Sequence, residues 1–144
     1  MKKKIFIDGE EGTTGLQINE RLLKHPEVDI LKIGHKVRKN PNFRKKMMLE
    51  SDLTFLCLPD HAALESYSLV KDEIYKRPII IDSSTAHRVS EDWIYGLPEI
   101  SNEHKMKISN AKNISIPGCY ATGVTTLLNP LLKNLYLLVL FSLT

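Results

Sequence analysis

Apolar residues in this chain gather in short continuous runs, and between the runs they recur every three or four positions. Short apolar runs are typical of strands buried on both faces of a parallel sheet, whereas the wider spacing is typical of amphipathic helices. The predicted strands are residues 4–8, 28–34, 53–58, 78–82 and 114–117. Their alternation with helices predicts an α/β fold, in which a doubly wound, mostly parallel sheet carries helices on both faces.

Helix signals occupy the segments between these strands. Residues 16–23 follow the first strand, and residues 101–108 show a weaker, mostly polar helical pattern. Asn40 and Pro41 can start a short helix, because asparagine caps helices and proline suits the first helical position. Asp60 can cap the helix after it in the same way. The residues expected on the inward faces of these two helices are Phe43, Met47, Met48, Ala63, Tyr67, Val70 and Ile74.

Composition places the chain among ordinary globular domains, with 144 residues of which 42% are hydrophobic and 26% charged. The net charge of +3 includes a basic start at residues 2–4, and no basic stripe is interleaved with aromatics. A nucleic-acid partner is therefore not expected. The apolar run at residues 135–143 is shorter than the roughly 20 residues that span a bilayer. No signal-peptide core precedes Asp8, so we expect a cytoplasmic protein without a membrane partner.

The two cysteines, Cys57 and Cys119, lie far apart in the sequence and form no CxxC pair. Neither a disulfide framework nor a metal site is expected from this spacing. Reduced thiols fit a cytosolic protein best. Cys57 falls inside the apolar run 53–58, so we expect it to belong to the core.

A glycine-rich loop, Gly9-Glu-Glu-Gly12-Thr-Thr-Gly15, joins the first strand to the first helix. Glycines let backbone N–H groups approach a pyrophosphate without Cβ clashes, and the helix N-terminus supplies a favourable field. The spacing is GxxGxxG, in place of the GxGxxG of many dinucleotide-binding proteins. A phosphate-binding loop is the favoured interpretation, and a plain strand-to-helix turn is the alternative.

The second predicted strand ends in a basic segment, His35-Lys-Val-Arg-Lys39. Proteins that bind NAD usually carry an acidic residue at this place, where it binds the ribose hydroxyls. Here no acid is present, and Lys36, Arg38 and Lys39 would suit the additional 2′-phosphate of NADP. An exposed basic loop without a ligand is the alternative.

Residues 83–88, Ser-Ser-Thr-Ala-His-Arg, follow the fourth predicted strand at its carboxyl end, which is where parallel α/β sheets bind ligands. Hydroxyl groups together with arginine are suited to holding a phosphate or a carboxylate. Ser84 and Arg88 are our candidates for that role. Serine and threonine also cluster in ordinary turns and helix caps, which is the alternative interpretation.

Cys119 follows a strand that Pro117 and Gly118 terminate, and an apolar segment with helical spacing comes after it. We therefore expect Cys119 at a helix N-terminus, where open N–H groups and the helix dipole favour an anionic thiolate. A thiolate in this position can act as a nucleophile. A small residue that simply packs well at a strand end is the alternative.

Four motifs in the same order resemble the short form of N-acetyl-γ-glutamyl-phosphate reductase, and the resemblance covers about residues 3–133. They are Phe6-Ile-Asp-Gly-Glu-Glu-Gly-Thr-Thr-Gly15, Asp82-Ser-Ser-Thr-Ala-His-Arg88, Tyr95-Gly-Leu-Pro-Glu99 and Pro117-Gly-Cys-Tyr-Ala-Thr-Gly123. The resemblance implies a Rossmann-like NADP-binding domain at residues 1–118 and the start of a catalytic domain at 119–133. It also implies a divergent apolar tail at 134–144.

The resemblance further implies the roles of individual residues and the reaction. Cys119 would be the nucleophile that forms a thioester with N-acetylglutamyl 5-phosphate, an acyl phosphate. NADPH would then reduce the thioester to the 5-semialdehyde, a step of arginine biosynthesis. The residues expected to bind NADP are Gly9, Gly12, Thr13, Thr14, Gly15, His35, Lys36, Arg38 and Pro59.

The chain departs from this family in its length and its histidines. Family members are about twice as long, and their second half supplies a dimerising sheet and a catalytic histidine. The histidines here all precede Cys119 and none matches that position; they are His25, His35, His61, His87 and His104. We therefore expect a truncated or frameshifted reading frame near residue 133, and a genuine terminus is the alternative. Activity, and the homo-oligomer expected of full-length members, stay open for this chain.

Two other functions remain under consideration. A non-catalytic NADP-binding remnant would bind the cofactor without aldehyde chemistry. An enzyme similar to aspartate-semialdehyde dehydrogenase would share Cys119 and the glycine loop. The His-Arg pair at residues 87–88 and the motif at residues 95–99 favour the acetylglutamyl branch.

Overall fold

The computed structural model describes residues 1–73 and 75–133 of the chain. Within these residues, six strands form one sheet in the order β2-β1-β3-β4-β6-β5, and every neighbouring pair is parallel. The strands are β1 (Lys3–Asp8), β2 (Val28–Leu31), β3 (Leu53–Leu56), β4 (Ile79–Asp82), β5 (Ile94–Tyr95) and β6 (Asn113–Ser115). The predicted Rossmann-like, parallel α/β fold is confirmed.

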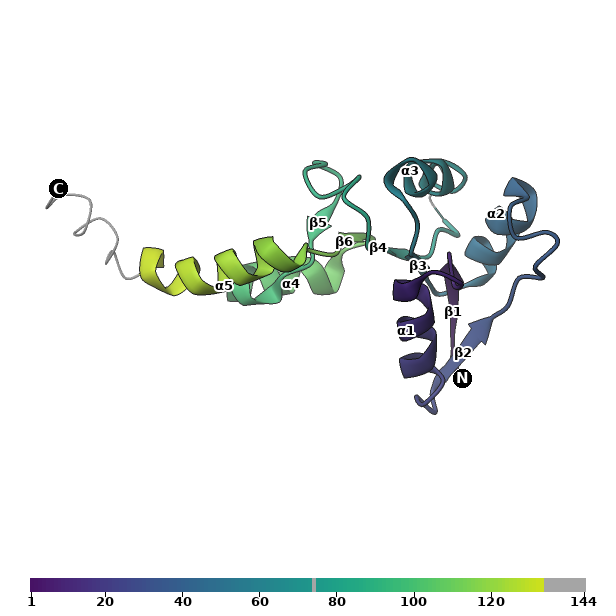
Figure 1. Ribbon diagram of the computed structural model, residues 1–144, viewed down its shortest axis with the longest axis horizontal. Coiled ribbons are helices and arrows are strands. Elements are labelled where there is room, and N and C mark those ends of the chain that lie inside the picture. The colour runs from purple at the N-terminus through teal and green to yellow at the C-terminus, as the bar shows by residue number, and fades with distance from the viewer. Residues whose placement is uncertain (74, 134–144) are drawn as a thin grey trace, which may run out of the picture.

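The helices are α1 (Thr13–Leu22), α2 (Pro41–Glu50), α3 (Asp60–Ser68), α4 (Asn102–Asn110), α5 (Cys119–Lys133) and a short 3₁₀ helix, η1 (Pro98–Ile100). Helices α1 to α3 connect the first four strands, η1 and α4 connect β5 to β6, and α5 follows β6. In Figure 1, α1 and α2 flank β1 on opposite sides. At the other end of the molecule, α4 and α5 contact η1, and α5 projects away from the sheet.

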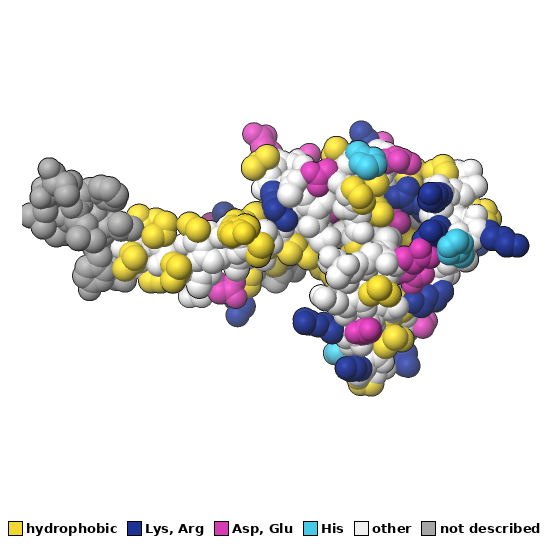
Figure 2. All heavy atoms as spheres, viewed as in Figure 1, with side chains coloured by type: hydrophobic (Ala, Val, Ile, Leu, Met, Phe, Trp, Pro, Cys, Tyr) yellow, Lys and Arg dark blue, Asp and Glu magenta, His cyan; other side chains and the backbone are white. Residues whose placement is uncertain are grey.

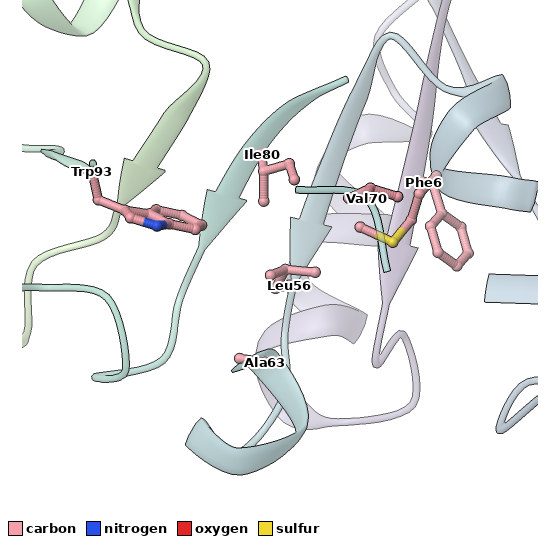
Figure 3. Packing of buried hydrophobic residues seen from close by; sticks show 7 residues of the cluster. Phe6, Leu56, Ala63, Val70, Ile80 and Trp93 are labelled. Carbon is pink, nitrogen blue, oxygen red and sulfur yellow. The ribbon is translucent and has the colours of Figure 1, made fainter. Parts of the chain in front are cut away.

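Successive side chains of β1 point to opposite faces of the sheet, so each face has its own layer of buried residues. Phe6 points to the face that α2 and α3 cover, and it belongs to the main buried cluster together with Met48 of α2. Its neighbours Ile5 and Ile7 are buried toward the opposite face. The cluster continues across the sheet through Leu56 and other buried residues; Figure 3 labels Phe6, Leu56, Ala63, Val70, Ile80 and Trp93.

The predicted inward face of α2 is wrong at one position. Phe43 is 45% exposed, whereas its neighbour Arg44 is only 6% exposed and Met48 is fully buried. Hydrophobic spacing favoured Phe43, but the buried carboxylate of Asp8 lies on this side of the helix and Arg44 is its partner. A buried carboxylate requires a compensating cation, and this requirement outweighs the burial of one aromatic ring.

Asp60 does not cap α3, contrary to prediction. Pro59 occupies the cap position, Asp60 is the first helical residue, and no side chain caps this helix. The Asp60 carboxylate instead accepts hydrogen bonds from Thr85. Of the predicted inward residues of this segment, Ala63 and Val70 are fully buried, although Val70 lies beyond the last helical residue. Ile74 lies outside the described residues.

Several element boundaries also differ from the predictions. The second strand ends at Leu31, before Gly34, and the third ends at Leu56, so Cys57 lies just beyond it and is half-buried. Residues 94–95, for which no strand was predicted, add a short strand at the edge of the sheet. Pairing with β6 forms this strand, and local sequence carries little signal for so short an edge strand.

Candidate functional site

The glycine loop follows β1 at the carboxyl edge of the sheet. Gly9 has a φ of 91°, and a Cβ there would lie 2.3 Å from the carbonyl oxygen of Cys57. A Cβ at Gly15 would lie 2.3 Å from the carbonyl oxygen of Gly9. These two glycines are therefore required by the fold itself. At Gly12 the nearest atom to a Cβ is 3.6 Å away, so the protein leaves space there.

The N-terminus of α1 opens beside this space. The helix begins at Thr13, and its cap residue Gly12 offers no side-chain hydrogen bond. The first N–H groups of an α-helix lack intrahelical partners, and the helix dipole makes this end positive. Gly12, Thr13 and Thr14 are exposed. The loop and helix start therefore form a cradle that suits an anionic group such as a pyrophosphate.

A pocket of about 490 Å³ extends from this cradle. Its lining combines the glycine loop, the ends of β2 and β3, and the starts of α2 and α3. The lining residues include Gly9, Gly12, Ile33, Arg38, Lys39, Arg44, Leu58, Pro59 and Ala62. Apolar side chains together with a phosphate cradle and cations suit a nucleotide. A larger hollow of about 570 Å³ near Tyr67 and Lys112 lies at the opposite ends of the strands.

The predicted basic residues after β2 divide into two groups. Arg38 lines the pocket, as does Lys39, whereas His35 and Lys36 do not belong to its lining. Arg38 forms an ion pair with Glu11 of the glycine loop, and the same carboxylate lies 3.6 Å from His35 Nε2. Arg38, one of the cations expected to meet a 2′-phosphate, is thus already paired with an acid of a different loop.

Arg44 is a pocket residue that sequence reasoning missed. Its Nε and Nη2 donate to one oxygen of Asp8 at 3.0 and 2.8 Å, and Ser66 donates to the same oxygen at 2.6 Å. Asp8 is the last residue of β1 and leads directly into Gly9. The buried network therefore anchors the start of the glycine loop to α2 and α3. The sequence signal that could have indicated a partner such as Arg44 was Asp8 at the end of a buried strand, because a buried carboxylate needs a partner.

Cys119 is the first residue of α5, as predicted, and it is exposed. The carbonyl of Gly118 accepts hydrogen bonds at 2.9 Å from both the backbone N–H and the hydroxyl of Thr122. These bonds close the first turn and fix the entry of the chain into the helix. The thiol therefore lies at the positive end of a 15-residue helix, open to a reactant.

Arg88 reaches the same place from the loop after β4. Its Nε donates to the carbonyl of Ile116 at 3.0 Å, and its Nη1 would lie 2.8 Å from a Cβ at Gly118. The structure thus brings together two residues that are 28 positions apart in the sequence. A fixed positive charge against Gly118, the residue before Cys119, suits an anionic substrate.

Ser84 lies in the same loop as Arg88, but its hydroxyl points toward Asp82. Ser84 is 7% exposed, and its Oγ and backbone N–H donate to the two carboxylate oxygens of Asp82 at 2.6 and 2.9 Å. His87 Nδ1 lies 2.6 Å from Asp82 Oδ2. The His87 ring stacks on the Trp93 ring, with 4.0 Å between the ring centroids. Asp82 therefore organises the loop that carries Arg88. In this arrangement Ser84 has a positioning contact, and its substrate role stays a prediction.

Two further ionisable groups, Asp60 and Cys57, follow β3 at the carboxyl edge of the sheet. The Thr85 backbone donates to Asp60 at 2.8 Å, and the Thr85 hydroxyl also donates to that carboxylate. These hydrogen bonds, the side-chain one foremost, lower the pKa of Asp60, and the charge of Arg88 contributes. Burial raises the pKa of the Cys57 thiol to about 11, a Ser83 hydrogen bond opposes the rise, and Asp8 and Asp82 add to it. Cys57 is therefore a neutral thiol under ordinary conditions, unsuited to nucleophilic attack.

Two kinds of feature are absent from residues 1–73 and 75–133. In that part of the chain, no helix has the length and apolar character needed to cross a bilayer. Over the same residues, no three His, Cys, Asp or Glu side chains come together in a way that could hold a metal ion.

The sequence and the fold are similar to those of known proteins. Residues 4–108 match the family described as semialdehyde dehydrogenase, NAD binding domain. The N-acetyl-gamma-glutamyl-phosphate reductases of Chelativorans sp. and Sinorhizobium medicae are 45% and 44% identical over 92% and 91% of this chain. The chain spans only 42% of the length of each of these two curated relatives.

A solved structure shares the fold at low sequence identity. The aspartate semialdehyde dehydrogenase of Candida albicans, crystallised with NADP, superposes with a TM-score of 0.64 at 19% identity. The match covers 93% of this chain and 48% of that protein. With its parallel sheet, glycine cradle and family match over residues 4–108, this chain belongs to the semialdehyde dehydrogenase family, of which it carries the NAD-binding domain.

Proposed function

We propose that this chain is the cofactor-binding and nucleophile-bearing part of an N-acetyl-γ-glutamyl-phosphate reductase of arginine biosynthesis. The observation that carries the proposal is the place of Cys119, exposed at the start of α5 with Arg88 against the preceding glycine. The 44–45% identity to reductases of that name supports the choice of substrate. In this proposal, residues 1–118 form the NADP-binding domain and residues 119–133 begin the catalytic domain.

The proposed chemistry begins with attack of the Cys119 sulfur on the carbonyl carbon of the acyl phosphate. A carbon–sulfur bond forms, the bond from carbon to the phosphate oxygen breaks, and phosphate leaves with the electron pair. Arg88 would attract the substrate phosphate and stabilise the charge that develops on it. Backbone N–H groups at the start of α5 would stabilise the carbonyl oxygen as it becomes negative.

The pocket beside the glycine loop would hold the nicotinamide cofactor. Gly12 and the N–H groups of Thr13 and Thr14 would bind the pyrophosphate, and Arg38 and Lys39 would face the adenosine ribose and its 2′-phosphate. Held in this pocket, NADPH would supply the hydride that reduces the Cys119 thioester to the aldehyde, and the Cys119 sulfur would leave with the electron pair of the carbon–sulfur bond. Pro59, with Leu58 and Ala62, would exclude water from one side of the cofactor.

Acylation of the chain by N-acetylglutamyl 5-phosphate tests this function. We expect intact mass spectrometry to find one acyl group on the wild-type chain, with release of one phosphate. The Cys57→Ser variant should be acylated like the wild type, and the Cys119→Ser variant should not. Equal acylation by aspartyl phosphate would support the aspartate-semialdehyde branch instead. Binding of NADP without any acylation would identify a cofactor-binding protein that lacks the acyl-transfer chemistry.

A further inference from the structure

The carboxylate of Glu11 crosses from the glycine loop to the basic segment after β2. It forms an ion pair with Arg38 Nη1 and lies 3.6 Å from His35 Nε2. The Glu11 side chain is 53% exposed, and that of Arg38 is 34% exposed. Basic and acidic side chains are interspersed on this side of the molecule, around α2 in the view of Figure 2. The contact therefore bridges two loops that line one pocket.

A second contact of the same kind lies beside it. Glu10, the preceding residue of the glycine loop, binds Lys32 at 2.7 Å. The segment from Lys32 to Asn40 has no acidic residue of its own. The glycine loop therefore supplies the carboxylates that pair with Lys32 and Arg38 of this basic segment, which is a role that a bound phosphate could otherwise have.

A carboxylate and a phosphate compete for the same donor. Both are anions that accept hydrogen bonds from a guanidinium, and Arg38 Nη1 already forms an ion pair with Glu11. A 2′-phosphate that reached Arg38 would have to displace the carboxylate and would also be repelled by it. A 2′-hydroxyl would meet no such obstacle, because a hydroxyl can donate to a carboxylate, as the ribose of NAD does in related folds.

We propose that Glu11 is a specificity-determining residue that occupies the subsite for the 2′-phosphate as a displaceable internal anion. This inference rests on the proposed cofactor function and deepens it. Glu11 weakens the binding of 2′-phosphorylated nucleotides and leaves room for unphosphorylated ones. The chain thus binds NADP with a smaller advantage over NAD than its basic segment alone would give.

The test compares NADP⁺ with NAD⁺, which differ only in the 2′-phosphate, by isothermal titration calorimetry at low salt. We expect Glu11→Gln to tighten NADP⁺ binding about five-fold, the scale of an exposed ion pair and a like-charge contact. NAD⁺ binding should stay within about two-fold of the wild type, because NAD⁺ lacks the 2′-phosphate that Glu11 would repel. Arg38→Met should weaken NADP⁺ selectively.

Glu20→Gln is the matched control. Glu20 is exposed near the end of α1, and its substitution makes the same change of net charge away from the pocket. It should leave both affinities unchanged. An equal effect of Glu11→Gln on NADP⁺ and NAD⁺, or an effect no larger than that of Glu20→Gln, would overturn the role of Glu11 alone. Failure of the wild type and of Glu11→Gln to bind either nucleotide would overturn the proposed cofactor function as well.

Discussion

Arg88 and Gly118 are in close contact, because a Cβ at Gly118 would lie 2.8 Å from Arg88 Nη1. The carbonyl of Ile116 holds the same guanidinium at 3.0 Å through Nε. The chain leads directly from Gly118 into Cys119, so the contact fixes a positive charge against the residue that precedes the exposed Cys119. The absence of a side chain at Gly118 is what permits this approach.

Removal of this charge should change which alkylating reagents Cys119 prefers. We expect Arg88→Met to lower the rate with anionic iodoacetate about five-fold at low salt, relative to neutral iodoacetamide, because one nearby charge is lost. Gly118→Ala should shift the ratio in the same direction by displacing the guanidinium. Labelling rates followed by mass spectrometry give the ratio. An unchanged ratio in Arg88→Met would contradict an electrostatic influence of Arg88 on this thiol.

Two glycines of the same loop should respond differently to alanine. Gly9→Ala should destabilise the fold by at least about 2 kcal/mol, since Gly9 has a positive φ and a Cβ would clash with Cys57. Gly12→Ala should leave stability nearly unchanged but weaken NADP binding, because its Cβ would occupy space that the pyrophosphate needs. Denaturant unfolding and calorimetry measure the two effects. Undiminished NADP binding by Gly12→Ala would argue against a pyrophosphate at this loop.

Arg44 should contribute far more to stability than its neighbour Lys45. We expect Arg44→Met to cost about 3–5 kcal/mol, because it leaves the buried Asp8 carboxylate without its cation. Lys45→Met removes a 2.7 Å ion pair with Glu73 that is exposed to solvent, so it should cost no more than about 1 kcal/mol. Equal costs in urea unfolding would show that the Asp8 network is not a major source of stability.

Cys57 should make the fold less stable at alkaline pH. Its folded pKa is raised from 9.0 to about 11, so between these values the unfolded state loses a proton that the folded state keeps. The corresponding stability is fully present below pH 9 and is lost as the pH rises to about 11. The free energy of unfolding of the wild type should therefore fall more steeply over this range than that of Cys57→Ala. Parallel stability curves of the wild type and Cys57→Ala would contradict a raised pKa of the half-buried Cys57 thiol.

The exposed stripe on α5 should promote self-association. Apolar side chains that are 40% to 72% exposed recur along this helix; they are Val124, Leu127, Leu128, Leu131 and Leu132. Contiguous apolar surface of this kind favours association. Leu127→Lys should reduce it, whereas Thr126→Lys adds the same charge on the opposite side of the helix and should not. Sedimentation velocity at several concentrations compares the self-association of the two variants with that of the wild type. A wild type that is monomeric at all concentrations would contradict the prediction.

The sequence by itself determined the features that depend on neighbouring residues. Apolar runs, glycine positions and proline breaks are local signals, and they predicted the parallel α/β fold, the loop at residues 9–15 and Cys119 at a helix start. Local signals did not predict the strand ends at Leu31 and Leu56 or the short strand at 94–95. Pairing with neighbouring strands sets where a strand ends.

Tertiary structure alone decided which side chains meet. Arg44 is buried and Phe43 exposed because Asp8, 36 residues away, supplies a carboxylate inside the sheet edge. Arg88 reaches Gly118, and Glu11 reaches Arg38, because parallel strands place the loops after their carboxyl ends at one edge. Such contacts join residues that no local pattern relates, since they follow from strand order and register.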